Sequence, residues 1–160
     1  MNISPSTVAD EHESIRSNDS IPPLINDVRD RLAPLFGVEV DHVSKAQYRT
    51  EVDAVFEDGD RAVNVAALSG LLRHLDWEGD YPGFVVDEFL GRKLAATIAG
   101  GEPFALLAEA TFHFADVHTH GAPDETAGRD DLDAALAAGF QTRLPGWKWT
   151  DGESPFSSEI

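Results

Sequence analysis

Apolar residues recur three and four positions apart along most of this 160-residue chain, a period typical of amphipathic helices. One such stripe covers residues 24–36, a second follows Ser44, and four more come later in the chain. Two-residue alternation, the pattern of strands, is confined to residues 38–40 and 144–149. The pattern therefore predicts an all-α fold, an irregular or orthogonal bundle of five to six helices.

Proline, glycine and capping residues divide the chain into three predicted parts. Residues 1–20 are polar and acidic, so we expect a disordered N-terminal arm. Residues 21–140 carry the helical periodicity, with an early helix stop expected near Pro34 and a predicted capping box at Ser44 and Gln47. Residues 141–160 are rich in proline and glycine and predict an extended, aromatic C-terminal tail.

The segment from Pro103 to Val117 is apolar on almost every side of its predicted helix. A helix without a polar face is normally surrounded by protein, so this segment is predicted to be the central helix of the bundle. A short alanine-rich helix over residues 131–138 is expected to follow it and to end at Gly139.

The charge balance indicates a salty environment. The chain has 29 acidic and 12 basic residues, a net charge of -17, and only three lysines. Such a surface repels itself in dilute buffer but not in molar salt, where the Debye length falls to about 3 Å. We therefore predict a halophilic source; an ordinary acidic protein, or one with a basic partner, is the alternative. No basic stripe is present, which disfavours binding to nucleic acid.

The chain shows no sign of membrane insertion or export. It has no run near the roughly 18 apolar residues of a membrane span, and its first residues lack a basic segment followed by an apolar one. It also has no cysteine, which excludes disulfides and thiolate chemistry. The expected location is the cytoplasm or a virion.

Polar residues on the segment 103–117 and just after it form the candidate metal site. Its members are Glu109, His113, Asp116, His118 and His120. The first three share one edge of a helix, and imidazole with carboxylate suits a divalent metal. The spacing matches neither HExxH nor paired ExxH motifs, and the same stripe is equally typical of the wetted edge of a buried helix. No cofactor is otherwise expected.

Aromatic residues in the tail form the candidate binding surface for a partner. The surface comprises Leu144 together with the aromatic residues Trp147, Trp149 and Phe156, and with Trp77 and Tyr81 in an earlier loop. Tryptophan and tyrosine bury large areas at interfaces, so these residues either pack on the chain's own helices, including those of a homo-oligomer, or dock on another protein.

No catalytic motif, such as a G-x-S-x-G turn or a phosphate-binding loop, occurs in the chain. The sequence therefore favours a small acidic helical interaction or structural subunit, such as an adaptor, an assembly chaperone or a virion or complex component. One alternative is a metal-dependent enzyme or metal-binding protein that uses the histidine and carboxylate cluster. A second alternative, a helix-turn-helix regulator, rests on the helices between Ser44 and Leu75.

Overall fold

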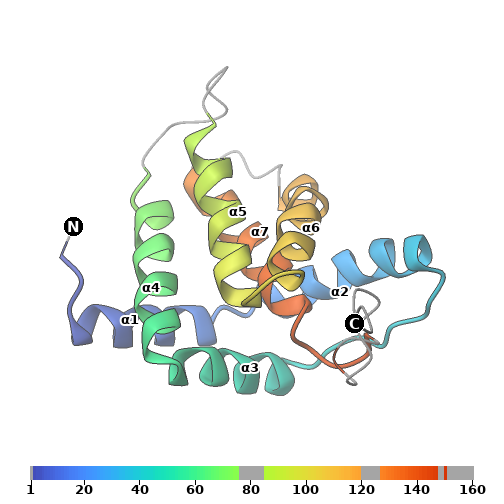
Figure 1. Ribbon diagram of the computed structural model, residues 1–160, viewed down its shortest axis with the longest axis horizontal. Coiled ribbons are helices and arrows are strands. Elements are labelled where there is room, and N and C mark those ends of the chain that lie inside the picture. The colour runs from blue at the N-terminus through green and yellow to red at the C-terminus, as the bar shows by residue number, and fades with distance from the viewer. Residues whose placement is uncertain (1, 76–84, 120–126, 148–149, 151–160) are drawn as a thin grey trace.

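The computed structural model describes residues 2–75, 85–119, 127–147 and 150 (Figure 1). Within these residues the chain forms seven α-helices, one short 3-10 helix and no strand. In chain order they are α1 (Pro5–Arg16), α2 (Ile21–Leu32), η1 (Ala33–Phe36), α3 (Lys45–Glu57), α4 (Gly59–Arg73), α5 (Val86–Ala99), α6 (Phe104–Thr119) and α7 (Ala127–Gln141). The predicted all-α class is confirmed, with one helix more than expected.

The additional helix is α1, which corrects the prediction of a disordered arm over residues 1–20. Ser4 caps α1 by accepting a hydrogen bond from the Thr7 amide at 3.2 Å, and Pro5 suits the first turn. Ile15 is fully buried and Glu11 binds Arg73 of α4 at 2.9 Å. The arm is ordered because one apolar side chain and a few polar ones dock it on α3 and α4, a contact that average polarity does not reveal.

Local signals set several helix ends. The predicted capping box of α3 is present, with Ser44 Oγ accepting from the Gln47 amide at 3.1 Å and Gln47 Oε1 accepting from the Ser44 amide at 2.9 Å. The expected early stop near Pro34 is also present, because α2 ends at Leu32 and the chain tightens into η1. Gly37 then takes a left-handed conformation, with φ at 67°.

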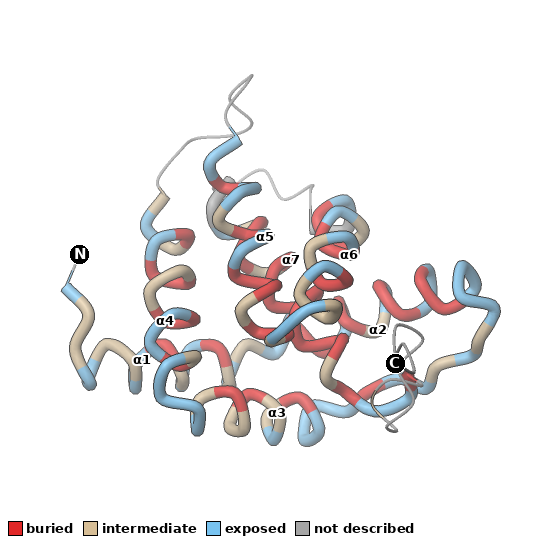
Figure 2. Tube along the Cα trace, viewed as in Figure 1, coloured by how far each residue is buried: buried red, intermediate tan, exposed pale blue. Residues whose placement is uncertain are grey.

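The centre of the bundle is α7, not α6 as its composition predicts. Figure 2 shows α7 buried behind α5 and α6, and every residue from Ala134 to Thr142 is buried. In contrast, α6 buries only the side that faces α5, α7 and α2. The alanine-rich helix is central because its small side chains let three or four neighbours approach it closely.

Two glycines allow the closest of these approaches. A Cβ at Gly139 of α7 would lie 2.8 Å from Cβ of Ile98, and a Cβ at Gly91 of α5 would lie 2.6 Å from the ring of Phe112 on α6. Both distances are shorter than any van der Waals contact, so no larger residue fits at either position without moving a helix.

The segment after α7 turns back instead of extending, which corrects the predicted tail for its described part. Leu144 and Trp147 are buried. Arg29 of α2, itself fully buried, donates to the carbonyl oxygens of Leu144 at 3.0 Å and Pro145 at 2.7 Å, and to Gln141 at 3.2 Å. The guanidinium thus caps the end of α7 and holds the turn against α2.

We expect Arg29→Met to lower the free energy of unfolding by about 3 kcal/mol or more, because methionine fills the space but leaves several buried carbonyl groups without a donor. Arg31→Met, on the exposed side of the same helix, serves as the control and is expected to change it by less than about 0.5 kcal/mol. Urea denaturation in molar KCl measures both. Equal effects of the two substitutions would contradict the anchoring role of Arg29.

Candidate functional site

The predicted metal ligands on α6 do not converge. Glu109 forms an ion pair with Lys93 of α5 at 3.6 Å, His113 is exposed, and Asp116 is buried against α7. Because an α-helix turns by 100° per residue, Glu109, His113 and Asp116 point in somewhat different directions from α6. One of these side chains can therefore lie in solvent while another lies in the core. Among residues 2–75, 85–119, 127–147 and 150, no three histidine or acidic side chains are placed to hold a metal ion. The His118 side chain and His120 lie outside the described part.

Asp116 instead belongs to a buried group of three carboxyls from three helices. Asp131 of α7 hydrogen bonds to the side chains of Asp87 on α5 and Asp116 on α6, and all three residues are buried. Burial, followed by the two neighbouring carboxyls, raises the pKa of Asp131 to about 10. This carboxyl therefore keeps its proton at neutral pH and joins the ends of three helices.

The protonated carboxyl predicts a pH-dependent effect of Asp131→Asn. Between the unfolded pKa near 4 and the folded pKa, the folded state holds a proton that the unfolded state has lost, so wild-type stability falls as pH rises. An amide removes this penalty. We expect Asp131→Asn to be close to wild type at about pH 4 and more stable than wild type at about pH 8, as measured by chemical denaturation.

Asp10→Asn, on the exposed side of α1, is the control for the loss of one negative charge. Its stability difference from wild type should not follow the same rise between the two pH values. A difference for Asp131→Asn that stays constant with pH would show that Asp131 is ionised in the folded state.

The predicted aromatic surface is only partly described. Trp147 is buried, donates its indole N–H to the Gln141 carbonyl at 3.1 Å, and lies under the Arg29 guanidinium at 5.7 Å. Leu144 is buried beside it, so these two residues pack within their own chain and are not available to a partner. The other four predicted residues, Trp149, Phe156, Trp77 and Tyr81, lie outside the described part of the chain.

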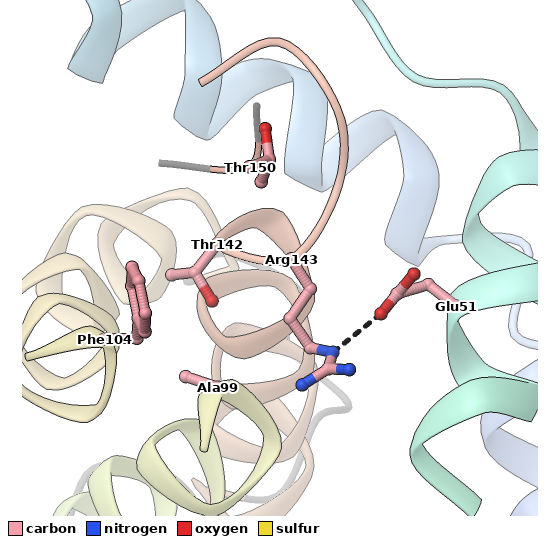
Figure 3. Close-up of a pocket in the computed structure, with 6 residues that line it drawn as sticks. All are labelled: Glu51, Ala99, Phe104, Thr142, Arg143 and Thr150. Carbon is pink, nitrogen blue, oxygen red and sulfur yellow. Dashed lines mark hydrogen bonds and ion pairs between the residues drawn. The ribbon is translucent and has the colours of Figure 1, made fainter. Parts of the chain in front are cut away.

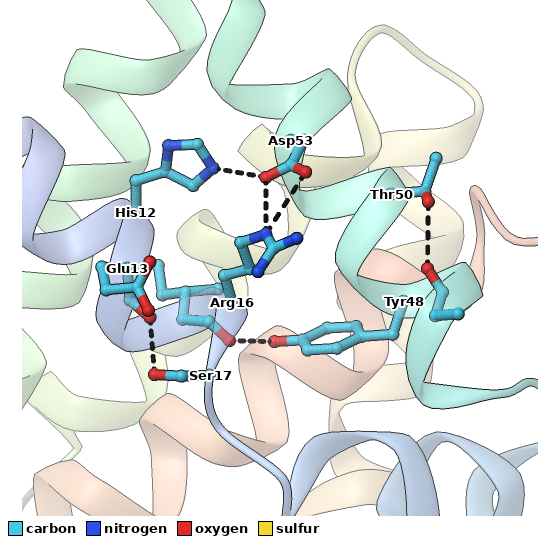
Figure 4. Close-up of polar contacts among 9 residues, drawn as sticks. His12, Glu13, Arg16, Ser17, Tyr48, Thr50 and Asp53 are labelled. Carbon is cyan, nitrogen blue, oxygen red and sulfur yellow. Dashed lines mark hydrogen bonds and ion pairs between the residues drawn. The ribbon is translucent and has the colours of Figure 1, made fainter.

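The polar contacts between α1 and α3 also explain a histidine that had no predicted role (Figure 4). His12 binds Asp53 at 2.7 Å and stacks on Phe56, while Arg16 binds the same carboxylate at 3.1 Å. Burial acts to raise the pKa of Asp53, but the hydrogen bonds from His12 and Arg16 outweigh it and lower that pKa. This group fastens α1 to α3.

A shallow cavity lies where α3, α5, α6 and the end of α7 meet (Figure 3). It has a volume of about 190 Å³, below the roughly 300 Å³ of a typical ligand pocket. The cation in its lining, Arg143, binds Glu51 at 2.7 Å. The residues that line it are Glu51, Ala99, Phe104, Thr142, Arg143 and Thr150. Because Arg143 is already paired with Glu51 and the cavity is small, these residues do not form a binding site for a ligand.

The helices of the helix-turn-helix alternative are α3 and α4, which a single residue, Asp58, connects. The two arginines of α4 are both paired, Arg61 with Asp58 at 4.0 Å and Arg73 with Glu11 at 2.9 Å. A cation that is already paired with a carboxylate contributes little to the binding of phosphate groups. Nothing in this geometry favours contact with nucleic acid.

The outer side of α5 and α6 is the most unusual surface among the described residues. Its large apolar side chains are exposed, with Phe89 at 66%, Leu106 at 55% and Val117 at 47%. We call it the α5–α6 face; it comprises Val86, Phe89, Leu106, Ala110, His113 and Val117. In Figures 1 and 2 both helices lie in front of α7, so this face points away from the core.

Two contacts fix how the helices of this face lie beside each other. Gly91 lies against Phe112, and Lys93 reaches Glu109 at 3.6 Å, so α5 and α6 are antiparallel neighbours. The same register places Phe89 level with His113. The two charges between the helices, Lys93 and Glu109, compensate each other. In a chain with a net charge of -17, the face is therefore apolar with no net charge.

Sequence reasoning missed the α5–α6 face. Periodicity shows that residues share a side of a helix, but it does not show which side is covered by other helices. One signal is available: the segment 103–115 contains a single charged residue, Glu109, in a chain where about one residue in four is charged. That local absence of charge fits an exposed apolar face as well as it fits burial.

The described residues form an all-helical domain. None of its described helices is long and apolar enough to cross a membrane. Over its whole length, residues 1–160, the chain matches the family described as Domain of unknown function (DUF7984), and it belongs to that family. No curated protein and no solved structure matches the chain significantly.

Proposed function

We propose that this protein is an interaction or structural subunit that works by docking its α5–α6 face on another protein surface. The observation that carries the proposal is an exposed apolar face without net charge on a chain of net charge -17. Exposed apolar clusters of this kind are typical of interaction sites. An adaptor, an assembly chaperone and a component of a complex or virion all use such a face.

The charge distribution supports this assignment. Within the described part of the chain, seven basic side chains already bind carboxylates: Arg16, Lys45, Arg49, Arg61, Arg73, Lys93 and Arg143. Elsewhere, that surface offers a partner exposed carboxylates, satisfied ion pairs and some exposed apolar side chains such as Leu35 and Leu71. Burying an unpaired carboxylate is costly. Docking is therefore favoured where the partner covers apolar side chains and the ion pair between Lys93 and Glu109.

The acidic surface supports a halophilic source and a cytoplasmic or virion-associated location. Many carboxylates of the described residues are exposed, Asp10, Asp27 and Glu57 among them. Their mutual repulsion acts over roughly 10 Å in dilute salt and over about 3 Å in molar salt. The folded state is therefore best suited to a medium with high salt.

We expect the melting temperature to be higher in about 3 M KCl than in about 0.1 M KCl, because salt screens repulsion within the folded chain. Circular dichroism during heating measures the change. The triple variant Asp10→Asn, Asp27→Asn, Glu57→Gln should gain less from salt than wild type. Equal melting temperatures of wild type at both concentrations would contradict the proposed halophilic adaptation.

The docking role is tested by Val117→Asp against a matched control, Val63→Asp. The two valines are exposed to the same degree, 47% and 46%, but Val63 lies on α4, away from the α5–α6 face. We expect affinity purification from native cells in molar KCl to recover a stoichiometric protein with wild type and Val63→Asp. Recovery should fall at least tenfold with Val117→Asp, since a buried carboxylate is costly.

Retention of the same protein by Val117→Asp would contradict docking through this face. The readout includes a second, differently tagged copy of the chain, so a self-associating protein is not missed. Both variants should give the wild-type circular dichroism spectrum, which shows that any loss concerns the surface and not the fold.

A further inference from the structure

The exposed residues of α6 have the spacing of a helix-pairing seam. Leu106, Ala110, His113 and Val117 follow one another at intervals of four, three and four residues, and all four are exposed. This is the spacing with which the apolar seam of one helix packs against another helix at a small crossing angle. Over its 16 residues, α6 is about 24 Å long, enough for three turns of contact.

The seam is also complementary to itself. A two-fold axis through the middle of the seam, between Thr111 and Phe112 in sequence, runs a second α6 antiparallel to the first. It places Leu106 opposite Val117 of the second copy and Ala110 opposite His113 of the second copy. Each large side chain at the centre thus meets a small one, as interdigitated packing requires.

Neighbouring residues of α5 agree with the same axis. Phe89 and Lys93 are both exposed and lie one turn apart, at equal distances from Gly91. Because Gly91 is level with Phe112, Phe89 and Lys93 lie on either side of the level of the axis, which places Phe89 at the level of Lys93 of the second copy.

The charge of the chain favours this face for contact between two copies. Two copies of net charge -17 repel each other in most orientations, and they meet at lowest cost through a surface without net charge. The α5–α6 face is such a surface. Two helices, each about 10 Å wide and roughly 20 Å long over the seam, bury an area at the lower end of specific interfaces, below about 1,200 Å² in total. A pair of that size associates weakly and responds to salt.

We propose that the α5–α6 face binds a second copy of this chain, with the two α6 helices antiparallel about a two-fold axis that pairs Leu106 with Val117 of the second copy. This inference rests on the proposed docking function and names its partner. Association is expected with a dissociation constant on the order of 10 μM in molar KCl and should weaken at least tenfold in about 0.1 M KCl.

Sedimentation equilibrium of the full chain tests the pairing. In about 3 M KCl, wild type and Val63→Glu should reach an average mass about 1.8 times the monomer mass of 17.4 kDa at concentrations on the order of 100 μM. Leu106→Glu and Val117→Lys, measured separately, should remain monomeric. An equal mixture of these two variants should recover the dimer, because the antiparallel register brings the carboxylate introduced in one chain opposite the ammonium group introduced in the other.

Each outcome decides the inference. A wild type that stays monomeric overturns it; if Val117→Asp nevertheless loses a cellular partner, the docking function stands with a different protein as occupant. A wild-type dimer whose two variants do not recover it on mixing overturns the antiparallel register. If both single variants still form the dimer, the two copies associate through another surface, and the α5–α6 face is not the interface.

Discussion

The buried guanidinium of Arg29 is the interaction on which the rest of the bundle depends. Burial lowers the pKa of Arg29 to about 10, so the group still carries its charge at neutral pH in a site with little water. Backbone carbonyl oxygens accept its hydrogen bonds, and their dipoles at the end of α7 offset the cation. Through them α2 and the turn ending at Trp147 are tied to the central helix. The side chains of α5 and α6 then pack on a fixed support.

Local chemistry made part of this structure predictable. The capping box at Ser44, the stop at Pro34 and the helical periods all depend on residues close in sequence, and each gave the right element. Features set by distant contacts were not predictable in this way. Ile15 orders α1 only because Tyr48 and the core of α3 lie beside it, and Arg29 looks like an exposed residue until its carbonyl partners are known.

The same distinction between local signals and distant contacts applies to the candidate sites. Glu109, His113 and Asp116 do share an edge of α6, but neighbouring helices separate them into an ion pair, an exposed ring and a buried carboxyl. The exposure of Phe89 and Leu106 depends on how α5 and α6 are rotated on α7. That rotation is set by Gly91, Gly139 and the small alanines, whose importance lies in the space they leave free.

The order of contacts along the chain has a consequence for synthesis. Three of the four backbone oxygens that accept hydrogen bonds from Arg29 lie 112 to 116 residues downstream, and Asn18 binds Asp133, which lies 115 residues downstream. While a ribosome makes the chain, α1 and α2 therefore have no completed surroundings until the segment near Pro145 has left the exit tunnel. Closure of the bundle is therefore a late step in the synthesis of the chain.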